Sequence, residues 1–273
     1  MSDDLGRLYL ELLKKSLTGT NAQDVFAIIE PRSPLLRVFY RPTRRILSTL
    51  GLDLVRRYPA DAPARVEGHD WPADALTMVG LLRLDHLQSY IERVLADDIP
   101  GDLIECGVWR GGACIFMRGV LKAYAAGRTV WVADSFRGLP KADAAALESD
   151  RRQRLWSFAS LSVPEQQVRA NFDRFGLLDE QVRFLPGWFE DSLAKAPIER
   201  LAVLRLDGDM YGSTHTALWA LYPKLSAGGY CIVDDYFAVP GARQAVDEFR
   251  SANGLTEPVR RIDWAAAFWR REQ

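Results

Sequence analysis

The chain has 273 residues, a length that suits one large α/β domain with appendages or two small domains. Hydrophobic residues make up 48% of it and charged residues 26%, a balance typical of a globular protein rather than a disordered one. The formal net charge of -1 provides no electrostatic footprint for nucleic acid or an anionic membrane. A small neutral partner is therefore favoured over a polyanion.

The sequence carries no signal of export or membrane insertion. No apolar run approaches the ~20 residues that span a bilayer, and the start, MSDDLGRLYL, lacks the basic and then apolar order of a signal peptide. We therefore expect a cytoplasmic protein. Cys106, Cys114 and Cys231 are odd in number and show no C-x-x-C spacing, so they predict small buried side chains rather than disulfides or a zinc site.

The N-terminal quarter of the chain changes in pattern twice. Helical spacing over 4–18, ended by a glycine, predicts an amphipathic helix whose apolar face carries Leu5, Leu8, Leu12 and Leu13. From there to about residue 74 the chain is rich in Pro and Arg, and we expect short helices and loops draped over the rest. Helical spacing returns over 75–95, so we divide the chain into an N-terminal part, 1–74, and a core, 75–273.

Beyond that helix, short apolar runs alternate with amphipathic segments. The runs are 102–106, 129–133, 181–185, 201–206 and 229–233. Strands that alternate with helices predict a parallel sheet covered on both faces, hence an α/β fold. We expect a final strand hairpin over 259–263 and 265–270, a capping box from Ser162 to Glu165, and a helix that ends at Asn253-Gly254.

Ligands of open α/β sheets bind beyond the carboxyl ends of the strands, so the residues there are the candidates for a site. The first strand ends in Glu105-Cys106-Gly107, and further glycines follow before the next helix. Glycines permit a tight turn and a close approach of backbone to ligand. The chain has no G-x-G-x-x-G, P-loop or Tyr-x-x-x-Lys motif, which disfavours dinucleotide and nucleoside triphosphate chemistry.

The second strand ends in Asp134, with Ser135 next to it. An acidic side chain at this position can accept hydrogen bonds from both hydroxyls of a ribose. Asp134 could instead only cap the following turn, but beside a glycine-rich turn we favour a nucleoside ligand.

Acidic residues follow the last two parallel strands. Asp207 ends one of them, and Asp234 and Asp235 end the other. Adjacent parallel strands would bring these side chains within reach of one ion, and three carboxylates without His or Cys suit Mg²⁺, Mn²⁺ or Ca²⁺. The alternative is that they are exposed helix-capping residues.

These segments together resemble the macrocin-type O-methyltransferases, the TylF, MycF and NovP group, which decorate sugars of macrolide and aminocoumarin antibiotics. The matching stretches cover nearly the whole chain apart from the Pro- and Arg-rich stretch and 141–160. They are LYLELLKKSLTGT, TMVGLLRLDHL, DLIECGVWRGGACIFMRG, ADSFRGLP, PGWFEDSL, LRLDGDMYGST and YCIVDDY.

The resemblance implies a class I methyltransferase fold, which is Rossmann-like with a mostly parallel seven-stranded sheet. It also implies S-adenosylmethionine as methyl donor, a Mg²⁺ (or Mn²⁺) ion, a glycosylated natural product as acceptor, and a dimer or higher assembly. Carried over by residue, Asp134 and Ser135 would border the ribose and Asp207, Asp234 and Asp235 the metal. The methionine part would lie at Met78, Glu105 and Gly107, and the adenine at Gly187, Trp188 and Phe189.

Methyl transfer to a sugar hydroxyl needs alignment of the reactants and removal of the hydroxyl proton. A metal at the oxygen would stabilise the developing alkoxide, so we expect a vicinal diol as acceptor. Asp209 is the first candidate for the general base and His215, at a helix start, the second; His215 could equally have no catalytic role. Segment 141–160 is interpreted as a lid, or alternatively as a solvated helix.

Two other functions remain compatible with the residues. A catechol- or caffeoyl-type methyltransferase would use the same aspartates on an aromatic diol. A protein that binds S-adenosylmethionine without turnover would have little need for three clustered carboxylates.

Overall fold

The computed structural model describes residues 3–21, 24–29, 34–59, 62–70, 74–141, 148–153 and 155–272. Its centre is a seven-stranded sheet in the order β5-β4-β3-β6-β7-β9-β8. The strands are β3 (Asp102–Cys106), β4 (Val130–Asp134), β5 (Val182–Pro186), β6 (Leu201–Leu206), β7 (Leu225–Val233), β8 (Arg260–Arg261) and β9 (Ala267–Arg270).

Strands β3 to β7 are parallel to their neighbours, and β9 and β8 add an antiparallel hairpin at the β7 edge. The predicted α/β fold with a mostly parallel sheet and a C-terminal hairpin is therefore confirmed. β4 and β5 each begin one residue later than expected, and β7 begins at Leu225 rather than at residue 229. The part of β7 that was missed, residues 225–228, contains Ser226 and Gly228, which lack apolar side chains and interrupt the apolar pattern.

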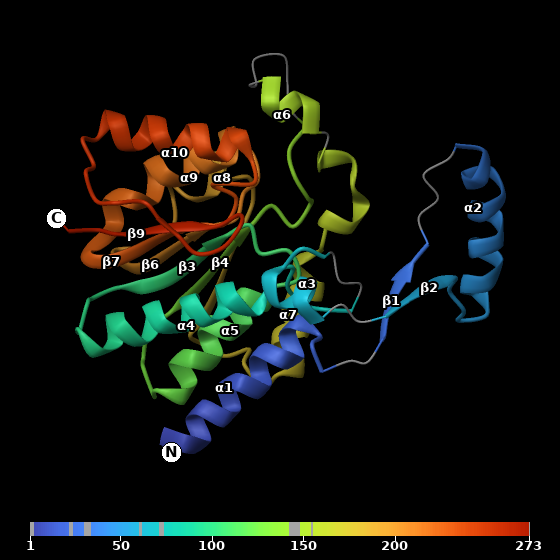
Figure 1. Cartoon of the computed structure of the whole chain (residues 1–273), viewed down its shortest axis with the longest axis horizontal. Helices are drawn as coiled ribbons and strands as arrows, with labels where there is room; N and C mark the ends of the chain where they lie inside the picture. The colour runs from blue at the N-terminus through green and yellow to red at the C-terminus, as the bar shows by residue number, and fades with distance from the viewer. Residues whose placement is uncertain are drawn as a thin grey trace.

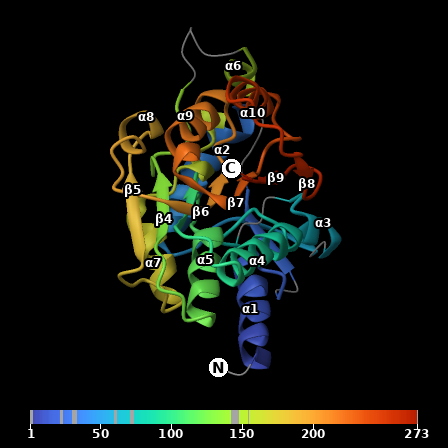
Figure 2. The ribbon, with the colours of Figure 1, turned by 90° about the vertical axis from the view of Figure 1, so that its left-hand side faces the viewer.

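Helices cover both faces of this sheet, as Figures 1 and 2 show. One face is covered by α4 (Leu81–Ala96), α5 (Gly112–Ala123) and α7 (Glu165–Arg174), and α1 (Asp3–Thr18) packs against α4 and α5 on the side away from the sheet. The other is covered by α8 (Phe189–Ser192), α9 (Tyr211–Leu221), which continues into the turn η3 (Tyr222–Lys224), and α10 (Pro240–Ala252). Each face has its own apolar core, because successive strand side chains point to opposite sides: Leu103 joins one core and Ile104 the other.

The buried face of α1 differs from the predicted one. Of the four predicted leucines only Leu13 is buried, together with Leu10 and Leu17, whereas Leu5, Leu8 and Leu12 are exposed. The helix carries leucines on two faces, and its contact with α5 selects between them. Gly119 of α5 lets that contact form, because a Cβ there would lie 2.3 Å from the Leu13 side chain.

The stretch before residue 74 is more ordered than its composition suggested. It holds a hairpin of β1 (Asp24–Ile28) and β2 (Val55–Pro59), a 16-residue helix α2 (Pro34–Thr49) with Pro42 inside it, and α3 (Ala62–Glu67). We call β1, α2 and β2 the arm; it extends away from the sheet and is not draped over it (Figure 1). The expectation of short helices and loops is therefore wrong for the arm, because β1 and β2 pair across a long insertion that no local pattern reveals.

Two predicted helix starts are also wrong. The helix expected over 75–95 begins only at Leu81, because the backbone of Leu76 bonds instead to Leu17 and Gly112. The capping box is absent, since Pro164 precedes α7 and no side chain caps it. The expected end at Asn253-Gly254 is confirmed: α10 ends at Ala252 and Gly254 has a φ of 62°.

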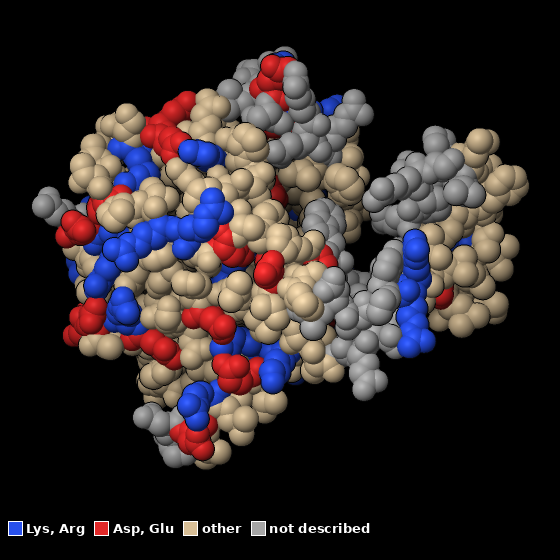
Figure 3. Space-filling view, in the orientation of Figure 1, with Lys and Arg blue, Asp and Glu red and all other residues tan. Residues whose placement is uncertain are grey.

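Acidic and basic side chains are interspersed over the face of the main body in Figure 3, in keeping with the net charge of -1. Within the described ranges, no helix combines the length and the apolar character needed to cross a bilayer. All three cysteines are buried.

Candidate active site

The residues that follow the parallel strands lie side by side because neighbouring strands end in register. Cys106 is opposite Leu206, and Leu206 is opposite Val233. The backbone ladder then continues beyond the strands through four amide groups that donate to a neighbouring strand: Gly107 to Ala133 (2.9 Å), Asp207 to Cys106 (2.8 Å), Asp234 to Leu206 (2.9 Å) and Gly187 to Asp134 (3.0 Å). Residues far apart in the sequence thus meet at one edge of the sheet.

The turn after β3 requires glycine at Gly107. Its φ is +88°, and a Cβ at this position would lie 1.8 Å from the carbonyl oxygen of Asp207. The close approach brings the loop after β3 against the loop after β6. Trp109, two residues further along the chain, also has a positive φ, of 48°.

Asp134 organises the same turn from β4. One of its carboxylate oxygens accepts the amide of Val108 at 2.8 Å, and the other accepts the amide of Phe136 at 2.7 Å. Burial raises the pKa of Asp134, and these amide donors oppose the rise. Ser135 donates its hydroxyl to the Gly138 carbonyl at 2.7 Å, so its side chain braces the next loop. The turn-capping role considered for Asp134 is present, and the residue also lines the pocket described below.

Beneath the strand ends lies a buried ion-pair network centred on Arg205. Glu105 and Arg205 are cross-strand partners in β3 and β6 and form an ion pair, and both are fully buried. Arg205 also binds Asp207, at 3.0 Å, and Asp234. The Cys114 thiol donates to the second oxygen of Glu105 at 2.8 Å. Burial raises the pKa of Glu105, and the charge of Arg205 opposes that rise.

A second arginine reaches the network from α4. Arg83 binds the other carboxylate oxygen of Asp234 and also binds Asp263, in the turn between β8 and β9. Burial would raise the pKa of Asp234, but Arg205 and Arg83 hold it below its usual value. Asp234 is therefore an ionised carboxylate fixed from two sides.

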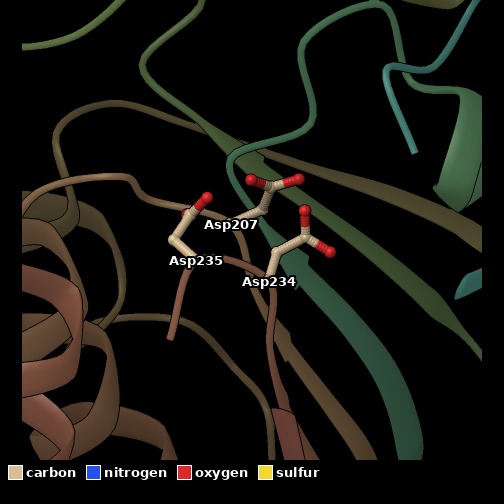
Figure 4. Close-up of side chains that lie close together, drawn as sticks. All are labelled: Asp207, Asp234 and Asp235. Carbon is tan, nitrogen blue, oxygen red and sulfur yellow. The ribbon is translucent and has the colours of Figure 1, made fainter. Parts of the chain in front are cut away.

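Asp207, Asp234 and Asp235 converge above this network. Figure 4 shows their carboxylates turned toward one another beyond the ends of β6 and β7, and one oxygen of each lies within 4.8 Å of the others. The Asp209 amide donates to Asp235 at 3.1 Å, on a backbone with a φ of 57°. This donor set, all carboxylate oxygen, is suited to a hard divalent cation.

Burial and the crowding of like charges raise the pKa values of three aspartates at this cluster. Burial and the charge of Asp234 raise the pKa of Asp207, and burial and Asp209 raise that of Asp235. Burial and Asp234 raise the pKa of Asp209 to about 7. A bound divalent cation would counter such shifts, because it favours ionised carboxylates.

A pocket of about 300 Å³ opens over these strand ends. It is lined by Asp209 and by all the residues predicted to hold the donor and the metal: Met78, Glu105, Gly107, Asp134, Ser135, Gly187, Trp188, Phe189, Asp207, Asp234 and Asp235. His215 is not part of its wall. One cavity thus joins the two sets of residues predicted separately for a nucleoside and for a metal. His215 lies one turn inside α9, between the rings of Tyr211 and Trp219. Its ring centroid is 5.5 Å from that of Tyr211 and 5.9 Å from that of Trp219.

Known proteins match this chain over its whole length. Residues 6–271 match the family model of macrocin O-methyltransferase (TylF). The chain belongs to the macrocin O-methyltransferase family. It is accordingly an O-methyltransferase with the fold of S-adenosylmethionine-dependent enzymes.

Two curated relatives of this methyltransferase are similar from end to end. The mycinamicin III 3''-O-methyltransferase of Micromonospora griseorubida is 50% identical over 276 residues, covering 99% of both chains. The 8-demethyl-8-(2,3-dimethoxy-alpha-L-rhamnosyl)-tetracenomycin-C 4'-O-methyltransferase of Streptomyces olivaceus is 48% identical over 272 residues, covering 99% of this chain and 95% of the relative. Among solved structures, the O-methyltransferase NovP superposes with a TM-score of 0.84 at 44% identity, covering 98% of this chain and 100% of that one.

Some pocket residues of this methyltransferase were missed from the sequence. Arg83 and Trp264 line the pocket, yet one belongs to a helix and the other to a hairpin turn, far from the strand-end motifs. Arg205 did leave a signal, because a charged residue interrupts the apolar run of β6. A charge in a fully buried strand requires partners, and here they are site carboxylates.

Proposed function

We propose that this enzyme transfers a methyl group from S-adenosylmethionine to a sugar hydroxyl of a glycosylated natural product, with a Mg²⁺ or Mn²⁺ ion at Asp207, Asp234 and Asp235. The observation that carries the proposal is the single pocket in which Asp134 and the three clustered aspartates all line the wall. The relatives named for mycinamicin III and for a rhamnosyl tetracenomycin support the choice of acceptor.

The side chains at the cluster fit such an ion. Three carboxylates can supply hard oxygen ligands, and no His or Cys is among them. When bound, the ion would supply positive charge that stabilises an alkoxide forming on the acceptor. Arg205 and Arg83 hold Asp234 in place, which keeps one ligand of the site ordered before anything binds.

The other residues of the pocket would orient the two substrates. Met78, Glu105 and Gly107 would border the methionine part of the donor, and Asp134 with Ser135 the ribose. The adenine would lie against Gly187, Trp188 and Phe189. Holding donor and acceptor in line is the larger share of catalysis for this displacement.

Asp209 would accept the proton of the acceptor hydroxyl at a carboxylate oxygen. It lines the pocket next to Asp235, whereas His215 is absent from the wall and packs between aromatic rings of its own helix. We therefore prefer Asp209 over His215 as the general base.

A methyl-transfer assay tests this function. Mycinamicin III, methyl α-L-rhamnopyranoside, catechol and demethyldecarbamoylnovobiocin, the compound in the name of a relative from Streptomyces niveus, would each be incubated with S-adenosylmethionine, first with Mg²⁺ and then with EDTA. We expect transfer to at least one glycoside and its loss with EDTA. EDTA-resistant transfer would remove the metal from the proposal, and transfer to catechol alone would favour an aromatic diol as acceptor.

We further propose that the N-terminal part, 1–74, is an appendage of a cofactor-binding core, 75–273, and that 141–160 closes over the acceptor. Residues 142–147 and 154 lie outside the described residues. The rest contains α6 (Glu148–Gln153) and the turns η1 (Leu155–Ser157) and η2 (Ala159–Leu161). Asp150 accepts the first amide of α9 at 3.1 Å, and Leu155 and Leu161 line the pocket. Proteolysis within 141–160 that was equally fast with and without donor product and glycoside would contradict the lid.

Finally, we propose that the enzyme is a homo-oligomer in which the N-terminal part contacts a second copy. Leu5, Leu8 and Leu12 form an exposed apolar stripe on α1 with the spacing of a two-helix seam. The arm adds exposed apolar side chains from α2, including Phe39, which is 73% exposed. Monomeric proteins seldom expose such contiguous apolar surface.

The stripe on α1 gives a direct test of this assembly. Light scattering should give at least twice the chain mass of 30.8 kDa for the native protein and a smaller mass for the double variant Leu8→Glu, Leu12→Glu. Carboxylates in an apolar seam would be buried without partners, which opposes association. Arg7→Glu, on the polar side of the same helix, is the control and should keep the native mass. A native mass of one chain would contradict the proposal.

A further inference from the structure

Trp264 lines the pocket at the end opposite to the predicted nucleoside. In the order of the sheet, Asp134 ends β4, Asp207 and Asp234 end the central strands, and Trp264 lies beyond them in the turn between β8 and β9. Ala267 at the start of β9 is opposite Val233, so this turn lies directly beside Asp234. An acceptor that reaches the aspartates from the side away from Asp134 would therefore meet Trp264.

The indole of Trp264 is held in place although 42% of the residue is exposed. Its ring nitrogen donates to the Glu67 carbonyl at 2.9 Å, and the ring stacks on His69 with centroids 4.7 Å apart and planes 20° apart. The Arg83 guanidinium lies 5.6 Å from the ring centroid. An aromatic ring fixed in a pocket but left open to solvent is prepared for a ligand, because little rotamer freedom remains to be lost on binding.

The turn that carries the ring is fixed to the aspartate cluster. Asp263 accepts the amides of Ala265 and Ala266 on one oxygen, at 2.9 and 2.8 Å, and binds Arg83 through the other. Arg83 in turn binds Asp234. The position of the indole is therefore tied through two ion pairs to a carboxylate of the proposed metal site.

We propose that Trp264 is the platform on which the sugar ring of the acceptor packs, an inference that rests on the sugar acceptor proposed above. The C–H groups of a pyranose carry weak positive charge and form an apolar face, which complements an indole ring. A deoxysugar, with one hydroxyl fewer, offers more of this face. Packing against a fixed ring sets which hydroxyls of the sugar reach Asp207 and Asp235, so Trp264 determines specificity rather than taking part in proton transfer.

The kinetics of Trp264→Phe and Trp264→Leu test this platform. The acceptor is the glycoside of the panel above that the native enzyme methylates fastest. We expect the KM for the glycoside to rise about 3-fold with Phe and 10-fold or more with Leu, because stacking contributes about 0.5–1.5 kcal/mol beyond area burial. The affinity for S-adenosylmethionine, measured by calorimetry, and the unfolding midpoint should stay near native values, which a purely structural role of Trp264 would not allow. Trp219→Phe is the matched control, since Trp219 is 47% exposed on α9 and absent from the pocket wall.

A second readout does not depend on turnover. In protein labelled with 5-fluorotryptophan and saturated with S-adenosylhomocysteine and Mg²⁺, the fluorine resonance missing from Trp264→Phe identifies this ring. Added methyl α-L-rhamnopyranoside should shift that resonance and leave the Trp219 resonance unchanged. Turnover of a glycoside with an unchanged KM in both variants, or an unmoved Trp264 resonance, would overturn the platform alone. Turnover of catechol only would overturn the sugar acceptor and the platform together.

Discussion

Replacing Asp235 with asparagine is expected to lower kcat/KM by at least about 100-fold while leaving donor affinity within about 3-fold. Asp235 is one of three carboxylates whose oxygens lie within 4.8 Å of one another, and the amide that replaces it is a much weaker ligand for a hard cation. The neutral side chain can still accept the Asp209 amide, so the loop should keep its conformation. Kinetics and calorimetric donor titration would measure the two effects.

The same variant should be no less stable than the native protein when EDTA is present. Burial and the charge of Asp209 raise the pKa of Asp235, so its ionised form is disfavoured when no cation is bound, and a neutral amide avoids that cost. Conversely, Mg²⁺ should raise the unfolding midpoint of the native protein and not that of the variant. Asp247→Asn, on the exposed side of α10, is the control that should behave like the native protein. An Asp235→Asn enzyme with native activity in Mg²⁺ would remove this residue from the proposed metal site.

Replacing Arg205 with methionine should lower the free energy of unfolding by about 3–5 kcal/mol, the usual cost of leaving a buried charge without its partner. Arg205 is fully buried and binds three carboxylates, so its loss leaves Glu105 and Asp207 without their ion-pair partner, whereas Asp234 keeps Arg83. Urea denaturation with the donor and metal absent would measure the change. Donor binding should weaken as well, because Glu105 lines the pocket.

Two further variants make this test specific to the network. Adding Glu105→Gln to Arg205→Met should recover part of the lost stability, because a neutral amide needs no counter-charge in that position. Arg118→Met is the control for removing a buried arginine, and its partner Asp179 keeps a side chain that is 27% exposed, so its loss should be smaller. A change below about 1 kcal/mol in Arg205→Met would show that the carboxylates are satisfied without the guanidinium.

The site contains more negatively charged carboxylates than its two arginines, Arg83 and Arg205, can neutralise. Arg205 pairs with Glu105, Asp207 and Asp234, and Arg83 pairs with Asp234, so two positive charges face the five carboxylates Glu105, Asp207, Asp209, Asp234 and Asp235. Such crowding costs stability, and a divalent cation would relieve it on binding.

The features that could be predicted from the sequence are those that depend on residues close together in the chain. The five parallel strands were predictable because each buried strand is a short apolar run of its own, and the positions of Gly107, Asp134, Asp207 and Asp234 follow from the strand ends alone. Register then brings these residues together in any parallel sheet of this order. The strands and the site residues at their ends were therefore predictable from the same local apolar runs.

A local sequence pattern does not determine which distant segment a helix or strand packs against. The leucines of α1 allow two buried faces, and packing against α5 and α4 buries Leu10, Leu13 and Leu17. The strands of the arm pair across the whole of α2, and Trp264 reaches the pocket only because β9 returns beside β7. The sequence by itself thus determined the alternation of strands and helices and the chemistry at the strand ends, since both depend on neighbouring residues. Tertiary structure alone decided the buried face of α1, the arm, and the arginines and the tryptophan that complete the site, because each depends on packing between segments distant in the chain.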